Sequence, residues 1–199
     1  MIAALTGSIG CGKSTVLEIF SRLEWFTLSA DRICHDLYNS GDLKFNGTIA
    51  ERWGAGIINA DGAADRKKIA AIVFNDRKEL DWLNSVLHPI IMDRAGQLIA
   101  SVNNKFVLFE VPLLYEAGME GRFESVICVW TSAANQHKRL KERGFDEKDI
   151  RLRVNNQLAS DVKLEKADYG LINEGCVGLL NEQCIILNHQ IREEHGRQR

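Results

Sequence analysis

Near its start the chain reads Gly7-Ser8-Ile9-Gly10-Cys11-Gly12-Lys13-Ser14, and this stretch decides the fold. It has the form G-x-x-x-x-G-K-[ST] of a phosphate-binding loop. An apolar run over residues 2–5 precedes it, and a helical pattern of apolar side chains over residues 16–23 follows it. Strand, loop and helix in this order are the context that the motif requires. The sequence therefore predicts a site for the phosphates of a nucleoside triphosphate such as ATP.

Each part of this loop has a physical task in binding phosphate. Glycines let backbone N–H groups turn inward because no Cβ stands in the way, and these donors join the helix N-terminus in an anion site. Lys13 is expected to reach the β- and γ-phosphates, and Ser14 to offer its hydroxyl to Mg²⁺. The expected nucleotide contacts are Gly10, Cys11, Gly12, Lys13, Ser14 and Thr15. The alternative is a glycine-rich turn that binds nothing.

The composition of the 199 residues limits the classes of protein to consider. Apolar residues make up 45%, enough for a core, and the net charge of −2 gives no general attraction to nucleic acid or to an anionic membrane. No apolar stretch is long enough to cross a bilayer or to act as a signal peptide. Five cysteines without a C-x-x-C pair fit free thiols in a reducing cytosol. We therefore expect a cytoplasmic protein without nucleic-acid or membrane partners.

Strand-like and helix-like segments alternate along the chain. The predicted strands are residues 2–6, 26–28, 106–110, 126–130 and 169–173. The predicted helices are residues 13–24, 31–38, 66–103 in two stretches that meet at Pro89, 133–144, 146–159, and a last one ending near 191 before a frayed tail. Residues 41–65 show no clear pattern. The alternation predicts an α/β fold, with a five-stranded parallel sheet covered by helices on both faces.

Two carboxylates follow predicted strands. Asp31 comes just after the second strand and Glu110 ends the third. In an open parallel sheet, ligands sit beyond the carboxyl ends of the strands, where the phosphate loop also lies. Asp31 is therefore a candidate to hold an attacking hydroxyl and accept its proton, and Glu110 a candidate for the Mg²⁺ shell. The alternatives are a helix N-cap for Asp31 and a surface ion pair for Glu110.

A charged helical stretch offers cations for phosphate. Arg139 and Arg143 are four residues apart and so share a helix face, from which guanidinium groups can grip phosphate oxygens. The alternative is a solvated helix face on which Glu142 pairs with these cations. Residue chemistry alone would not single out Arg66 or His88.

Taken in order, these motifs resemble the dephospho-coenzyme A kinase family over nearly the whole chain. The matching segments are the loop over residues 5–15, Ser29-Ala30-Asp31, Asp61-Gly62 with Arg66, Leu87-His88-Pro89, Val111-Pro112-Leu113-Leu114-Tyr115-Glu116, Gln136 with Arg139 and Arg143, Gln157, and Asn173. The Leu-His-Pro and Val-Pro-Leu-Leu-x-Glu elements are much more specific than the loop. One departure is Ser29, which stands where the family usually has an aspartate, so the metal geometry is in question more than the reaction.

The resemblance implies a reaction in which ATP phosphorylates the 3′-hydroxyl of the ribose of dephospho-coenzyme A. It implies a single domain, residues 1–199, with a core over about 1–65, 104–136 and 167–191, substrate-binding helices over about 66–103 and a lid over about 137–166. It makes Asp31, Lys13 and Arg139 the catalytic candidates. It places Arg66, His88 and Arg143 with Asp31 near the acceptor, and Asn173 near the adenine of ATP.

Rival functions remain open from the sequence. The nearest is another small-molecule kinase with a phosphate-binding loop, for example one acting on a nucleoside monophosphate. A regulatory NTPase switch would carry the guanine-reading Asn-Lys-x-Asp motif, which this sequence lacks. A nucleotide-binding module without activity would have no need of Lys13, Ser14 and Asp31. We expect a monomer or a weak homo-oligomer.

Overall fold

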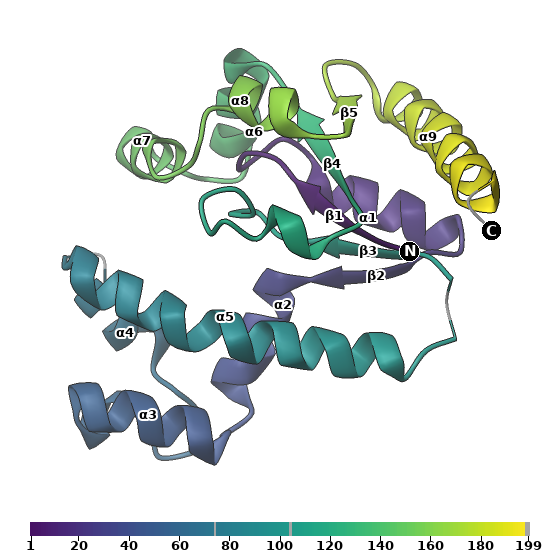
Figure 1. Cartoon of the computed structure of the whole chain (residues 1–199). Helices are drawn as coiled ribbons and strands as arrows, with labels where there is room; N and C mark the ends of the chain where they lie inside the picture. The colour runs from purple at the N-terminus through teal and green to yellow at the C-terminus, as the bar shows by residue number, and fades with distance from the viewer. Residues whose placement is uncertain (74, 104, 198–199) are drawn as a thin grey trace. The chain divides into compact units, whose positions relative to one another are not determined.

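A computed structural model describes residues 1–73, 75–103 and 105–197 (Figure 1). The chain forms two compact units, the first made of Met1–Ser29 and Val102–Arg199, the second of Ala30–Ser101. The division into core, substrate-binding helices and lid stays a prediction. The second unit begins well before residue 66, where the sequence placed the start of the substrate-binding helices.

The first unit is built on a parallel sheet, as predicted. Its strands are β1 (Ile2–Thr6), β2 (Phe26–Ser29), β3 (Val107–Glu110), β4 (Ser125–Trp130) and β5 (Tyr169–Ile172). They lie in the order β2-β3-β1-β4-β5, and every pair is parallel. The central strands are runs of buried apolar residues because both faces of the sheet are covered. The phosphate loop leaves the middle strand, β1, between the ends of β3 and β4.

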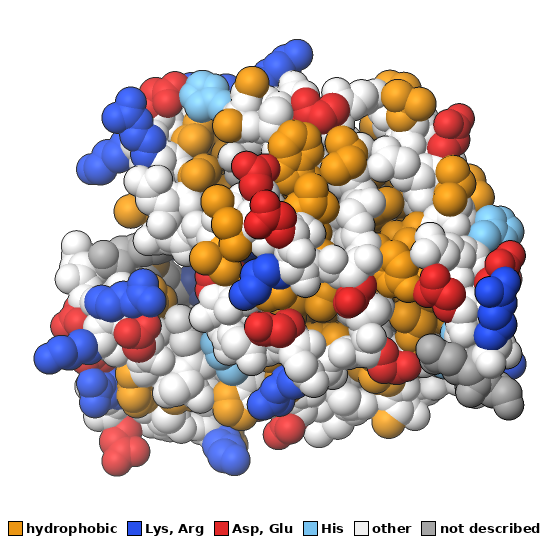
Figure 2. Space-filling view, turned by 45° about the horizontal axis from the view of Figure 1, so that its top comes forward, with side chains coloured by type: hydrophobic (Ala, Val, Ile, Leu, Met, Phe, Trp, Pro, Cys, Tyr) orange, Lys and Arg blue, Asp and Glu red, His pale blue; other side chains and the backbone are white. Residues whose placement is uncertain are grey.

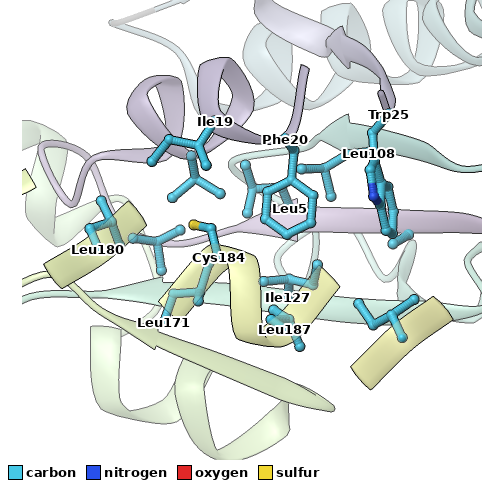
Figure 3. Packing of buried hydrophobic residues seen from close by; sticks show 14 of the residues in the cluster. Leu5, Ile19, Phe20, Trp25, Leu108, Ile127, Leu171, Leu180, Cys184 and Leu187 are labelled. Carbon is cyan, nitrogen blue, oxygen red and sulfur yellow. The ribbon is translucent and has the colours of Figure 1, made fainter. Parts of the chain in front are cut away.

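Helices α1 (Lys13–Arg22) and α9 (Val177–Arg197) cover one face of this sheet and pack on each other. Figure 3 shows the apolar side chains that they bury against the strands, among them Phe20, Leu108, Ile127 and Leu187. The expectation of a frayed tail from Arg192 was wrong, because α9 continues to Arg197. Arg192 donates to the carbonyl oxygen of Leu23 at 2.9 Å, which fastens the extended helix to the end of α1.

The opposite face is covered by a helix from the predicted lid. The helices in that segment are α6 (Ala133–Glu142), α7 (Glu147–Asn155) and α8 (Ser160–Lys166). α8 packs on β4, where the indole Nε1 of Trp130 donates to Asp161 at 2.6 Å. The predicted helix over residues 146–159 is thus too long. The chain leaves α7 at Asn155, forms a short connection and starts the separate helix α8. The 3₁₀ turn η2 (Glu120–Arg122) lies between β3 and β4.

The second unit is helical. It consists of α2 (Ala30–Asn39), α3 (Leu43–Trp53), the 3₁₀ turn η1 (Ala55–Ile57), α4 (Arg66–Val73) and α5 (Arg77–Ala100). Its core contains Leu37, Phe45, Ile49, Ile69 and Leu83. No sequence pattern predicted α3. Asp42 caps it by accepting from the N–H of Phe45 at 2.9 Å, and burial of Phe45 and Ile49 holds it despite its polar composition.

Pro89 does not divide the long helix. α5 runs through it without interruption, so the prediction of two stretches meeting there was wrong. A proline inside a helix leaves the carbonyl group four residues earlier without its usual donor. Here that residue is Ser85, and both Ser85 and Pro89 are exposed, so water can take the place of the missing N–H.

The surface carries no dominant charge. Figure 2 shows Lys and Arg side chains interspersed with Asp and Glu on one face of the molecule, in line with the net charge of −2. Within residues 1–73, 75–103 and 105–197, no helix combines the length and the apolar character needed to cross a membrane.

Candidate active site

The loop between β1 and α1 leaves backbone donors at the start of a helix. Gly12 is the N-cap of α1, with φ of 105°, and no side chain caps the helix. The first helical hydrogen bond runs from the N–H of Val16 to the carbonyl oxygen of Gly12, at 3.2 Å. The N–H groups of Lys13, Ser14 and Thr15 therefore remain available as donors. Together with the helix dipole they make the anion site that the motif predicts.

Asn173 lies against this loop. Its Nδ2 atom donates to the carbonyl oxygen of Cys11 at 2.8 Å. A Cβ at Gly12 would come within 2.3 Å of the same Nδ2 atom, so glycine is required here by space as well as by its positive φ. The side chain of Asn173, just after β5, thus packs against the backbone that leads into α1.

Arg139 joins the same group of residues. Its Nη2 atom donates to the main-chain oxygen of Asn173 at 2.9 Å and to the side-chain oxygen at 3.2 Å. Its Nη1 atom lies 3.4 Å from the carbonyl oxygen of Cys11 and from the hydroxyl of Thr131. The structure thus brings three predicted site elements together at one edge of the sheet: the loop, the α6 arginine and the residue after β5.

Lys13 is held within its own loop. Its Nζ atom donates to the carbonyl oxygens of Gly7 at 2.9 Å and Ser8 at 3.1 Å, and the residue is buried. The neighbouring thiol of Cys11 is buried too, and burial raises its pKa above the ordinary value although Lys13 acts in the opposite direction. Cys11 is therefore a neutral thiol at physiological pH, and its backbone N–H and C=O are the groups it offers to the site.

Glu110 ends β3 beside the strand that carries the loop. It is in register with Leu5 on β1 and with Ser29 on β2. It is half-buried and, within the described part of the chain, its carboxylate forms neither a hydrogen bond nor a salt bridge, so the predicted alternative of a surface ion pair is not observed. Ser14 is exposed at the start of α1. Among the described residues no group of three or more His, Cys, Asp or Glu side chains forms a metal site, and the Mg²⁺ contacts stay a prediction.

Asp31 lies in the first turn of α2, in the second unit. Its side chain is exposed, and in the described structure its carboxylate accepts no hydrogen bond. It therefore does not cap the helix, which was the alternative reading of its position. The chain keeps it two residues beyond Ser29, the last residue of β2.

Arg66 starts α4 and packs against α2. Its Nη1 atom is 3.2 Å from Nδ1 of His35, and its guanidinium stands 5.6 Å from the centre of the Tyr38 ring. Both Asp31 and Arg66 are close enough to Cys34 to act on its pKa, which burial raises to about 11. The structure thus places two predicted acceptor-site residues of opposite charge around one stretch of α2.

The other two predicted acceptor residues lie on different elements. His88 is half-buried in the middle of α5. Arg143 follows the last residue of α6, is exposed, and among the described residues has no hydrogen bond or salt bridge for its guanidinium. Of the pair Arg139 and Arg143, only Arg139 contacts the phosphate loop.

Several contacts of the loop were not predicted from the sequence. They come from Gln136 and Gln157, which bind the backbone of Ile9, and from Ser160, which binds the hydroxyl of Ser8. Lys163, in the segment predicted to form a lid, is fully buried and pairs with Glu116 at 2.8 Å. No local pattern marks a residue that must bind a loop 148 positions away along the chain. The two glutamines do appear in the motifs that carry the family resemblance, which was the one available signal.

Comparison with known proteins identifies the family. The sequence model of the dephospho-CoA kinase family matches residues 1–178. A dephospho-CoA kinase of Aquifex aeolicus is 32% identical over 174 residues, which cover 87% of this chain and 88% of the relative. One of Leptospira interrogans is 34% identical over 185 residues, or 92% of this chain and 89% of the relative.

A solved structure has the same architecture. The structure of a dephospho-CoA kinase from Campylobacter jejuni superposes with a TM-score of 0.71 at 27% identity, covering 98% of each chain. Sequence and fold agree, and the chain belongs to the dephospho-CoA kinase family.

Proposed function

We propose that this chain transfers the γ-phosphoryl group of ATP to the 3′-hydroxyl of the ribose of dephospho-coenzyme A, giving coenzyme A and ADP. The observation that carries the proposal is the convergence of the uncapped N-terminus of α1, Lys13 and Arg139 on one loop, in a member of this family. Family membership identifies the acceptor class, and the loop supplies the phosphate-binding chemistry.

The triphosphate end of ATP is expected at the start of α1. The free N–H groups of Lys13, Ser14 and Thr15 would bind the phosphate oxygens, and the Lys13 ammonium would neutralise charge on the transferring group. Arg139, already fixed by Asn173 and Cys11, supplies a second cation from the α6 side. These donors are held before the substrate arrives, which is the condition for strong electrostatic stabilisation of the transition state.

The chain also has oxygen donors suited to Mg²⁺, namely the exposed Ser14 hydroxyl and the Glu110 carboxylate, which has no counter-charge in salt-bridge contact. A bound Mg²⁺ would neutralise charge on the β- and γ-phosphate oxygens. Ser29, beside Glu110 in the sheet, contributes a hydroxyl where the family usually has a carboxylate.

Asp31 is proposed to orient the acceptor. Among the described residues its carboxylate has no hydrogen bond or salt bridge, so it can accept the proton of the ribose hydroxyl as the 3′ oxygen attacks the γ-phosphorus. The new bond joins that oxygen to phosphorus, and the bond between the γ-phosphorus and the bridging β–γ oxygen breaks to release ADP. Arg66, His88 and Arg143 are proposed to contact the acceptor. We further propose that the enzyme works in the cytoplasm, as a monomer or weak homo-oligomer, without nucleic-acid partners.

The test is ADP release measured with a panel of acceptors. The purified chain is supplied with Mg²⁺ and ATP, and with dephospho-coenzyme A, a nucleoside monophosphate, or no acceptor. The proposal expects ADP release that depends on dephospho-coenzyme A, with the product phosphorylated at the 3′ position by ³¹P NMR. Faster release with a nucleoside monophosphate would favour the rival small-molecule kinase, and slow release that needs no acceptor would favour a regulatory NTPase.

A further inference from the structure

Two glutamines from different elements hold one residue of the phosphate-binding loop. Gln136 on α6 donates from Nε2 to the carbonyl oxygen of Ile9 at 2.7 Å. Gln157, just after α7, accepts from the N–H of Ile9 through Oε1 at 2.9 Å. Gln136 is buried and Gln157 half-buried, so neither contact is a loose surface bond.

The bond from Gln136 also sets the direction of a phosphate donor. A peptide unit is planar and trans, so the carbonyl oxygen of Ile9 and the N–H of Gly10 point in opposite directions from the same plane. Holding the Ile9 oxygen toward α6 therefore turns the Gly10 N–H away from α6. Within the described residues this N–H has no hydrogen-bond partner. It is one of the donors that the motif supplies to phosphate.

The bond to Gln157 acts in the same way on the preceding peptide unit. The N–H of Ile9 and the carbonyl oxygen of Ser8 belong to one plane and point in opposite directions. The Ser8 oxygen accepts from the Nζ atom of Lys13 at 3.1 Å and from the N–H of Cys11 at 3.3 Å. Gln157 therefore orients the carbonyl group that holds the Lys13 ammonium.

The segment that carries Gln157 is itself firmly attached. The N–H of Leu158 donates to Oε1 of Glu116 at 2.8 Å, and the same oxygen accepts from Lys163 at 2.8 Å. Lys163 also donates to the carbonyl oxygen of Pro112 at 2.8 Å. Glu116, held by the buried Lys163, thus fixes the main chain next to Gln157, so the glutamine can impose a direction on the loop and does not simply follow it.

We propose that Gln136 and Gln157 are positioning residues of the phosphate-binding loop, which aim the Gly10 N–H and the Ser8 carbonyl group that holds Lys13. The proposal rests on the proposed function only in assuming that this loop binds ATP. In this proposal the glutamines act through the loop, and their effect passes through the two peptide planes on either side of Ile9.

The experiment compares the double variant Gln136→Leu/Gln157→Leu with the control Gln183→Leu. Gln183 accepts from the N–H of Ile172 at 2.8 Å and donates to its carbonyl oxygen at 2.9 Å. The control thus loses the same two kinds of backbone contact, at β5 instead of the loop. Calorimetry gives the dissociation constant of the ATP analogue AMP-PNP with Mg²⁺, and steady-state assays give KM for ATP and for the acceptor.

For the double variant, we expect the AMP-PNP dissociation constant and the KM for ATP to rise about tenfold or more, from two lost orienting hydrogen bonds. The KM for the acceptor should change less than twofold, and Gln183→Leu should bind AMP-PNP as the unaltered protein does. If the double variant does not fold, each single variant should raise the dissociation constant several-fold.

Nucleotide binding equal to that of the control would overturn the proposal, as would a loss that affects ATP and acceptor equally and follows the fall in melting temperature. A protein that binds AMP-PNP but fails to phosphorylate dephospho-coenzyme A would refute the proposed function alone. The binding comparison would then still decide whether the glutamines position the loop.

Discussion

The phosphate-binding loop and the α2–α4 surface, which we define by Asp31 and Arg66, are held in opposite ways. The loop is tied by hydrogen bonds from residues far along the chain, such as Gln157 and Asn173, which accept from or donate to its backbone. On the α2–α4 surface, Asp31 is exposed and its carboxylate has no hydrogen bond in the described structure. The guanidinium of Arg66 contacts two ring groups of α2, the imidazole of His35 and the ring of Tyr38.

This difference shows which proposed functional groups are fixed by hydrogen bonds and which are left without a partner. Phosphate chemistry benefits from donors fixed in advance, because such donors stabilise the charge that develops on the transferring group without a free-energy cost of reorganisation. A carboxylate that must meet a sugar hydroxyl gains from staying unpaired until the acceptor arrives, since an existing ion pair would compete with it. Kinases also need the acceptor to complete the site, so that water is not phosphorylated in its place.

The largest effect should come from removing Lys13, the cation of the phosphate-binding loop. Lys13→Ala removes the ammonium held by Gly7 and Ser8, and kcat/KM should fall about a thousandfold because charge on the transferring phosphoryl group loses its fixed partner. The measurement is the initial rate of ADP formation. The control is Lys138→Ala, an exposed residue of α6, which should retain the original rate. A fall of less than tenfold in Lys13→Ala would contradict the assigned role.

The second test removes the charge of Asp31 on the α2–α4 surface. Asp31→Asn keeps the size of the side chain but removes its basicity, so turnover should fall about a hundredfold while the dissociation constant of AMP-PNP changes less than twofold. Asp36→Asn, another exposed carboxylate on α2, is the matched control. Near-normal turnover in Asp31→Asn would reduce Asp31 to a favourable charge at the start of a helix.

The third test concerns the ion pair between Lys163 and Glu116, which holds the main chain at Leu158, next to Gln157. Lys163→Met removes a fully buried ammonium and leaves the carbonyl oxygen of Pro112 without its donor, so the free energy of unfolding should fall by about 2 kcal/mol. Urea denaturation measures the change, with Lys148→Met on the exposed surface of α7 as the control. Adding Glu116→Gln should recover part of the loss, because a neutral amide oxygen can still accept from Leu158. Equal stability of Lys163→Met and the control would show that the pair contributes little.

The smallest effect is expected at an exposed cluster of charged side chains on α6 and α7. Lys141, and after it His137, hydrogen-bond to Glu147 and lower the pKa of its carboxyl to about 2 from the ordinary 4.5. The folded state favours the ionised form, so this contribution is complete above pH 4.5 and is lost as the pH falls toward 2.

The melting temperature of Glu147→Gln, compared with the unaltered protein, checks this. The difference should be small at neutral pH because the pair is exposed, should shrink further in high salt, and should vanish near pH 2. A difference that grows on acidification would show that the sign is wrong.

The sequence was informative wherever local chemistry and position coincide. The glycines and Lys13 of the loop, followed by an amphipathic helix, predicted the first strand, the turn and α1 to within two residues. Runs such as Val107–Glu110 predicted buried parallel strands, because only strands covered on both faces are apolar throughout. These features depend on neighbours along the chain, which a sequence displays directly.

Local chemistry misled where distant contacts decide the outcome. Pro89 looked like a break, yet its place on the exposed side of α5 makes it tolerable. Residues 192–197 looked frayed, yet Arg192 ties them to Leu23. Lys163 belongs to the charged segment of the predicted lid, yet it is fully buried and donates to Glu116 and Pro112. In each case the outcome depends on surroundings in the fold that sequence spacing does not reveal.

By itself, then, the sequence determined the phosphate loop, the parallel sheet and the kinase family, because backbone conformation, burial pattern and motif order are written in consecutive residues. Only the tertiary structure decided that Arg139 and Asn173 meet at the loop, that two glutamines orient its peptides, and that Asp31 stays unpaired. The physical reason is that hydrogen bonds and ion pairs act over a few ångströms, so they depend on which distant residues the fold brings together.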